Sequence, residues 1–224
     1  MPDKSERNER QISGYAFLLG SSVGKKLLMA VTGLCLIGFL AVHLLGNTMA
    51  FAGAAAFNGY AEKLHSLEPY FTVFNIGLLT VALVHVIVGL LLFVENVKAR
   101  PQRYAMVRNP GGVTVGSRTM PYTGLLILVF VVLHLAKFTF VDKSIVPIYQ
   151  QMAATFAEPA WVILYVAAMA IVAVHVSHGF WSLFQTLGVS SPRHLPLIMK
   201  LGLAVTLAIG IGFGILPIYL LIIA

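Results

Sequence analysis

Charged residues and cysteine are both scarce in this sequence, and each scarcity excludes a class of protein. Only 10% of the 224 residues are charged, whereas 58% are hydrophobic. A water-soluble domain of this length would need a much larger charged surface. Cys35 is the only cysteine, so this chain alone cannot form an intrachain disulfide, a cysteine-ligated zinc site or an iron–sulfur cluster.

The hydrophobic residues gather in five long blocks, each close to the roughly 20 residues that cross a bilayer as an α-helix. The blocks run Leu27–Thr48, Phe71–Val94, Tyr122–Phe140, Trp161–Leu183 and Leu197–Leu221. The period-two alternation of a membrane β-barrel is missing, and backbone in hydrocarbon must satisfy its own hydrogen bonds. We therefore predict an all-α integral membrane bundle of five helices, with a cytoplasmic N-terminal segment at residues 1–26 and one membrane domain at residues 27–224.

Basic residues are unevenly distributed between the two sides of the predicted bundle. Twelve lie before the first block or in the second and fourth connections: Lys4, Arg7, Arg10, Lys25, Lys26, Lys98, Arg100, Arg103, Arg108, Arg118, Arg193 and Lys200. The other three are Lys63, Lys137 and Lys143. Because positive charge marks the cytoplasmic side, this predicts a multi-pass protein of a bacterial-type cytoplasmic membrane, with the N-terminus inside and the C-terminus outside. The net charge of +7 then reflects topology and lipid contact, and no nucleic-acid partner is expected.

Histidines are the notable polar residues of the spans, and the first four spans each hold at least one. They are His43, His85, His134, His175 and His178. Ionisable side chains inside a membrane are costly, so they are read first as functional. Acidic residues are almost missing from the spans, with Glu95 at one end. This pattern disfavours a proton-coupled transporter and favours neutral imidazoles that bind a metal.

Depth sorts four of these histidines into two pairs. At about 1.5 Å per residue, His43 and His134 lie about 20–25 Å from the cytoplasmic side. By the same rise, His85 and His175 lie about 21 Å along spans that enter from outside, and so nearer the cytoplasm. Two histidines at matched depth can fill both axial positions of one haem iron. Without a Cys-x-x-Cys-His motif, two non-covalent, bis-histidine haems b are predicted; histidines that only hydrogen-bond neighbouring helices are the alternative.

Residues close to these histidines in sequence are candidate haem surroundings. Gly89 and Gly179 each follow a histidine by four, so they share its helix face and leave room for a porphyrin edge or for close helix packing. His178 follows His175 by three. It could itself be the ligand, could hydrogen-bond a propionate or a quinone, or could pack between helices.

The histidine pattern and several short stretches resemble the single-chain, five-helix, di-haem cytochrome b subunit of succinate dehydrogenases and fumarate reductases. The matching stretches are Ser21–Lys26, Thr32-Gly33, Phe57–Ala61, His85 with Gly89, and His175–Gly188, within roughly residues 15–190. The resemblance implies that the ligand in the fourth span is His175, which stands four residues before Gly179 and six before Trp181. It also implies haem ligation by His85 with His175 near the cytoplasm and by His43 with His134 near the outer face.

The resemblance further implies partners and a role in electron transfer. A flavoprotein subunit would carry the dicarboxylate chemistry, and an iron–sulfur subunit would dock on the cytoplasmic face, at Gln11–Lys26 and Lys98–Arg118. This chain would pass electrons between the iron–sulfur subunit and a quinone, with menaquinone expected. The alternatives are a cytochrome b anchor of another quinone-linked complex, and a haem-free transporter or assembly protein.

Three residues of the first outer connection are candidates for quinone binding: Glu62, His65 and Glu68. Solvated loop side chains are the alternative interpretation for all three. Lys137, one turn beyond His134, could pair with a propionate of the outer haem or reach the membrane interface. Some family members carry a glutamate two residues before the fourth ligand, and here that position is Ala173.

Overall fold

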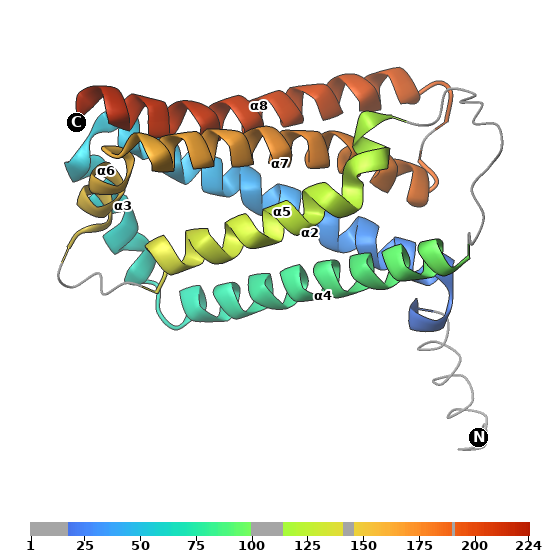
Figure 1. Ribbon diagram of the computed structural model, residues 1–224. Helices are drawn as coiled ribbons and strands as arrows, with labels where there is room; N and C mark the ends of the chain where they lie inside the picture. Colours follow the sequence, from blue (N-terminus) through green and yellow to red (C-terminus); the bar gives the residue numbers. More distant parts are fainter. Residues whose placement is uncertain (1–17, 100–113, 141–145, 190) are drawn as a thin grey trace, which may run out of the picture.

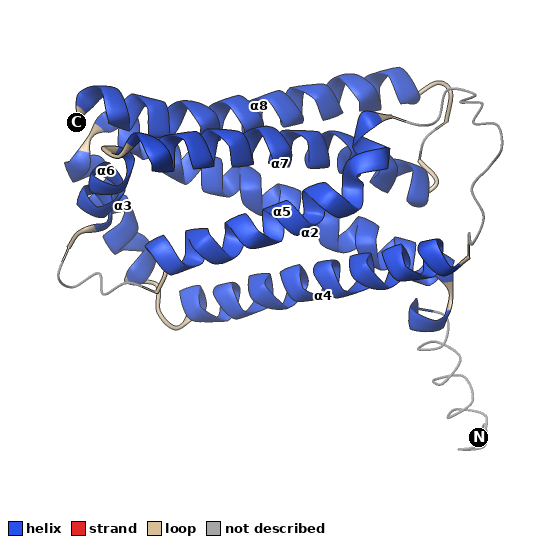
Figure 2. Ribbon diagram, in the orientation of Figure 1, coloured by secondary structure: helices blue, strands red, loops and turns tan. Residues whose placement is uncertain are grey.

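The computed structural model describes residues 18–99, 114–140, 146–189 and 191–224. Within these ranges every regular element is a helix, as Figure 2 shows. In the part of the chain that is described, five helices are long and apolar enough to cross a membrane. They are α2 (Ser22–Thr48), α4 (Tyr70–Lys98), α5 (Val115–Phe138), α7 (Pro159–Thr186) and α8 (Leu195–Ile223). The prediction of a five-helix membrane bundle is confirmed.

Two of the long helices begin before the apolar blocks that predicted them, and at each a side chain caps the first turn. α2 begins at Ser22 rather than Leu27, where the Ser21 hydroxyl accepts a hydrogen bond from the Gly24 amide at 3.0 Å. α5 begins at Val115 rather than Tyr122, behind a capping box formed by Thr114 and Ser117. Such caps satisfy backbone amides that have no partner within the helix. Hydropathy thus located the apolar stretch of these two helices, and capping set the residue at which each helix begins.

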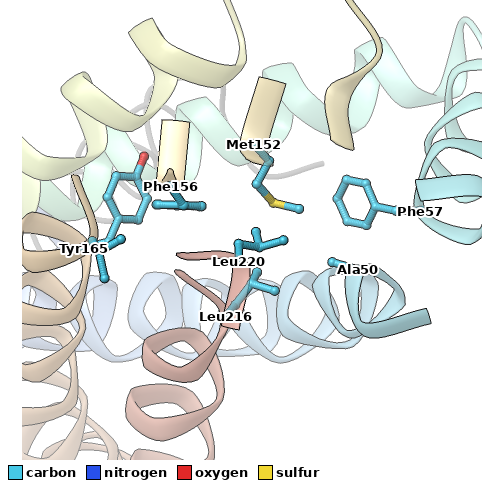
Figure 3. Packing of buried hydrophobic residues seen from close by; sticks show 8 residues of the cluster. Ala50, Phe57, Met152, Phe156, Tyr165, Leu216 and Leu220 are labelled. Atoms are coloured by element: carbon cyan, nitrogen blue, oxygen red, sulfur yellow. The ribbon is translucent and has the colours of Figure 1, made fainter. Parts of the chain in front are cut away.

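Short helices close one end of the bundle, where simple connections were expected. These are η1 (Met49–Ala52), α3 (Ala54–His65) and α6 (Ile148–Phe156), and they gather beside the C-terminus in Figure 1. Figure 3 shows Phe57 of α3, Met152 of α6 and Leu220 of α8 meeting in one apolar cluster. The amide of Asn58 joins α3 to α6, accepting from the Tyr149 amide at 3.0 Å. We call this the α3/α6 end, and the opposite one, where α2 begins, the Lys25 end.

Four of the long helices surround a common centre, and the fifth lies outside them. α2 packs on α4 and on α7, α5 packs on α7, and α4 contacts α5 only lightly. The order around the centre is therefore α2, α4, α5, α7, with α2 facing α5 across one diagonal and α4 facing α7 across the other. α8 packs along α7 and α2 on the outside, in keeping with the view in Figure 1.

The helices differ sharply in how much protein covers them. α7 buries eight residues, many of them against α8, whereas Val88 is the one buried residue of α4. Small residues let α8 approach closely: a Cβ on Gly210 would lie 2.9 Å from the Cβ of Ala173. α4 is held mainly by α2, and the Lys25 ammonium of α2 makes an ion pair with Glu95 of α4. Protein packing therefore secures α7 well and α4 sparsely.

Candidate functional site

The four histidines predicted as ligands meet in two pairs, one across each diagonal of the bundle. The rings of His43 on α2 and His134 on α5 have centroids 6.1 Å apart and planes at 86°. The rings of His85 on α4 and His175 on α7 have centroids 6.5 Å apart and planes at 67°. These are the pairs that depth along the spans predicted. Each pair joins two helices that do not adjoin around the bundle.

The spacing within each pair suits two axial ligands on one metal. A metal–imidazole nitrogen bond is about 2 Å and the ring centroid lies about 1 Å behind the nitrogen, so two axial imidazoles have centroids about 6 Å apart. In the part of the chain that the structure describes, no three His, Cys, Asp or Glu side chains gather as a bare metal ion would require. A pair of imidazoles instead matches a haem, whose macrocycle supplies the remaining ligands.

Threonine hydroxyls orient both histidines of the pair nearer the Lys25 end. The Oγ1 of Thr32 on α2 lies 3.0 Å from Nδ1 of His85. The Oγ1 of Thr123 on α5 lies 3.1 Å from Nδ1 of His175. Both threonines are buried, with 7% and 8% of their surface exposed. With Nδ1 engaged in this way, the Nε2 atom of each ring is the nitrogen left for a metal.

A glycine follows each of these threonines and lies against the same histidine ring. A Cβ on Gly33 would lie 3.4 Å from Cε1 of His85, and one on Gly124 would lie 3.5 Å from Cε1 of His175. Larger side chains at these positions would therefore press on the imidazoles. Because glycine has no side chain, space is left beside each imidazole ring. Such space suits a site that binds a flat ligand.

The pair nearer the α3/α6 end has different surroundings. Nδ1 of His134 lies 3.2 Å from the phenol oxygen of Tyr165, which is 7% exposed. His43 stacks on Phe39 with ring centroids 5.2 Å apart and planes at 16°. The Asn47 amide nitrogen lies 3.4 Å from Nε2 of His43 and donates to the His43 carbonyl at 2.8 Å. This pair is set among aromatic rings rather than between threonines.

The glycines predicted as haem surroundings face methionines instead of a histidine. A Cβ on Gly89 would lie 3.5 Å from the methyl of Met29, and one on Gly179 would lie 4.0 Å from the methyl of Met120. Both methionines belong to the helix packed beside the glycine's own. A thioether side chain is flexible and can yield space. The haem-edge role of these glycines stays a prediction.

His178 of α7 lies apart from the two pairs and contacts the start of α5. Its Nδ1 is 3.5 Å from the Thr114 hydroxyl, and a Cβ on Gly116 would lie 2.7 Å from the His178 Cβ. The ring lies 6.2 Å from that of Trp181, whose buried indole nitrogen has no hydrogen-bond partner among the described residues. His178 therefore supports the close approach of α5 to α7, and its possible role beside a propionate stays a prediction.

The remaining predicted residues lie at the α3/α6 end and make local contacts. The Lys137 ammonium stands 4.9 Å above the Trp161 ring, a cation–π contact. His65 is exposed and engages the Ala61 carbonyl at 2.7 Å through Nδ1. Glu62 and Glu68 are also exposed, and a carboxylate oxygen of Glu68 accepts from the Thr72 hydroxyl at 3.0 Å. The part of Glu62, His65 and Glu68 in quinone binding stays a prediction, as does that of Lys137 beside a haem propionate.

The sequence contained a signal for the two threonines. The pair Thr32-Gly33 precedes His43, and the pair Thr123-Gly124 precedes His134 at the same spacing. In the fold, each threonine contacts a histidine of the next long helix: Thr32 of α2 contacts His85 of α4, and Thr123 of α5 contacts His175 of α7. The recurrence indicates that α2 with α4 and α5 with α7 are two hairpins of one design, each giving one histidine to each pair.

Comparison with known proteins agrees with the pattern of residues. Over 157 residues the chain is 28% identical to the succinate dehydrogenase cytochrome b558 subunit of Bacillus subtilis (strain 168), a match that covers 69% of this chain and 75% of that protein. No protein-family model and no solved structure matches the chain. This similarity agrees with the resemblance that the sequence motifs indicated.

Proposed function

We propose that this chain, a relative of succinate dehydrogenase cytochrome b subunits, is the di-haem membrane anchor of a succinate:quinone oxidoreductase. Electrons would pass between an iron–sulfur subunit, the two haems b and a membrane quinone, with menaquinone as the expected species. The observation that carries the proposal is the pair of histidine contacts across the bundle, with ring centroids 6.1 Å and 6.5 Å apart. Neither contact arises from simple packing of adjacent helices.

The residues present fit haem in chemistry as well as in spacing. Haem iron supplies one-electron redox chemistry when bound, and two imidazoles per iron leave no open position for oxygen. The threonines and Tyr165 hold three of the four imidazoles by Nδ1, so that Nε2 is free for the metal. The sparse protein contacts of α4 fit a helix whose inner face a cofactor would cover. The chain's own part is to bind and orient the cofactors.

The two pairs would divide the membrane into short electron-transfer steps. Thr32 of α2 contacts His85 and so lies at the depth of one pair, and His43 of the same helix belongs to the other pair. The two residues are eleven positions apart, which is about 16 Å along a helix. That separation is about half of the roughly 30 Å hydrocarbon core. Electrons entering at the Lys25 end would meet the His85–His175 haem first and the other haem second.

The orientation and the partners follow from the basic residues. The Lys25 end would face the cytoplasm and receive the iron–sulfur and flavoprotein subunits, and the C-terminus would lie outside. Both expected docking segments extend outside the described residues, and Lys25 and Arg118 belong to the parts that are described. Dicarboxylate chemistry would belong to the partners, and this chain would hold no catalytic residue for it.

Quinone protons would be handled at the α3/α6 end, where Glu62, His65 and Glu68 are exposed. The alternative route, a carboxylate inside α7, does not suit this chain. Ala173 holds that position and packs directly against Gly210 of α8, with a Cβ–Cβ separation of 2.9 Å if the glycine carried one. A glutamate there would require α8 to move away.

A reduced-minus-oxidised spectrum with a pyridine haemochrome assay on the purified complex tests the proposal. About two haems b per chain are expected, together with a co-purifying flavoprotein whose succinate oxidation reduces a menaquinone analogue. Two haems with a different partner enzyme would indicate an anchor of another quinone-linked complex. A folded protein that was produced with ample haem supply and still lacks a Soret band would overturn the electron-transfer role and favour a haem-free transporter or assembly protein.

A further inference from the structure

We propose that Thr32 and Thr123 are positioning residues that fix the tautomer of the two histidines of the Lys25-end haem. The inference rests on the proposed function, since it concerns the histidines as haem ligands. It assigns a role to two residues that composition and hydropathy do not distinguish from other membrane threonines. The role is to hold the proton of each imidazole on Nδ1, away from the nitrogen that binds iron.

Counting hydrogen atoms around the threonines determines the direction of each hydrogen bond. A hydroxyl has one hydrogen to donate and two lone pairs. Thr32 Oγ1 lies 2.6 Å from the Leu28 carbonyl, which can only accept, so the hydroxyl donates there. Thr123 Oγ1 lies 3.1 Å from the carbonyls of Thr119 and Met120, which likewise only accept.

Each threonine therefore meets its histidine with a lone pair. Nδ1 of His85 and Nδ1 of His175 must carry the proton and donate it to the hydroxyl, because the hydroxyl hydrogen is already used. In a neutral imidazole the other nitrogen, Nε2, is then unprotonated. The backbone of α2 and of α5 thus dictates, through one hydroxyl each, which imidazole nitrogen can bind a metal.

Burial makes this arrangement difficult to replace. Both threonines are more than nine-tenths buried, so water would not readily take the place of a lost hydroxyl. An imidazole N–H left without an acceptor in such a site is costly. The partners of metal-bound histidines also tune the ligand, since a hydrogen bond from Nδ1 raises the basicity of the imidazole. A more basic ligand favours ferric over ferrous iron and lowers the midpoint potential.

The test compares Thr32→Val and Thr123→Val with the serine variants T32S and T123S in the intact complex. Valine keeps the shape and removes the hydroxyl, whereas serine retains it. Thr80→Val on α4 is the matched control, because Thr80 is an exposed membrane threonine whose hydroxyl donates to the Ile76 carbonyl of its own helix. Haem content, redox titration by absorbance and the ferric low-spin EPR signal are measured for each.

We expect both valine variants to raise the midpoint potential of one haem only and to weaken its retention by about 10–100-fold, the usual loss when such a partner is removed. The serine and Thr80→Val variants should behave as wild type. Loss of that haem in valine but not serine variants would also support the role. Unchanged potentials and EPR signals in both valine variants, or equal loss in serine and valine variants, would overturn it. A wild-type protein without haem would instead refute the proposed function.

Discussion

Removing two histidines at a time gives the sharpest test of the site. The number of haems that remain per chain should depend on which two histidines are removed. His85→Ala combined with His175→Ala removes both histidines of one pair. His85→Ala combined with His134→Ala removes one histidine from each pair. The first double variant should keep one six-coordinate, low-spin haem per chain, and the second should keep none.

The expected number of haems in each double variant follows from the distances between the histidines. The two levels are separated by eleven residues along α2, about 16 Å at 1.5 Å per residue. Sites more than about 7–10 Å apart and without shared partners act independently. Within a pair, the 6.5 Å ring separation of His85 and His175 fits two ligands of one iron, so under the proposed function removing the second would cost no further low-spin haem.

Low-spin haem is counted by EPR of the oxidised complex and by pyridine haemochrome analysis, with monodispersity in detergent as the folding control. His65→Ala, on an exposed histidine of α3, should leave both haems in place. If His85→Ala with His175→Ala removed both haems, or if His85→Ala with His134→Ala spared one, the pairing across the diagonals would be wrong. Ligation within each hairpin, by His43 with His85 and by His134 with His175, would instead leave no low-spin haem in either double variant.

Three further changes test packing. Gly33→Leu should expel the Lys25-end haem, because a Cβ there is already 3.4 Å from an imidazole carbon, whereas Gly38→Leu on the same helix has open space and should leave the haem spectrum unchanged. Gly210→Val should destabilise the protein by about 1–3 kcal/mol through overpacking against α7, and Gly214→Val, with nothing within 4 Å, should cost little in the same thermal melts. Glu95→Gln should cost about 0.5–1 kcal/mol, because it removes the charge opposite the buried Lys25 ammonium while Glu95 itself is half exposed; an unchanged melting temperature would show that this ion pair is dispensable.

The depth of the histidines could be predicted from the sequence, because it depends on the helical rise per residue alone. A membrane span is a nearly straight rod with a fixed rise, so the depth of His43 or His175 follows from counting residues, and the pairs follow from depth. The rotation of one helix about another is not fixed by such a count. The contact between Thr32 and His85 therefore emerged only from the fold, although the recurrence of Thr-Gly was visible beforehand.

The ends of the elements were harder to predict for a different reason. Hydropathy reports residence in hydrocarbon, but the start of α5 depends on the Thr114 cap, seven residues earlier than the apolar block suggested. The helices α3 and α6 are short and packed by their tertiary contacts, notably through Phe57 and Met152, so no long periodic pattern announced them.

The diagonal placement of the histidine pairs has a consequence for biogenesis. Helices that follow one another along the chain form two hairpins, α2 with α4 and α5 with α7. In the proposed holo-protein each haem would bind one histidine from each hairpin and so hold the two hairpins together. α4 has little protein contact beyond α2, so its attachment to the rest would await the cofactor delivered to His85. A chain that lacked haem would then hold α4 mainly through α2.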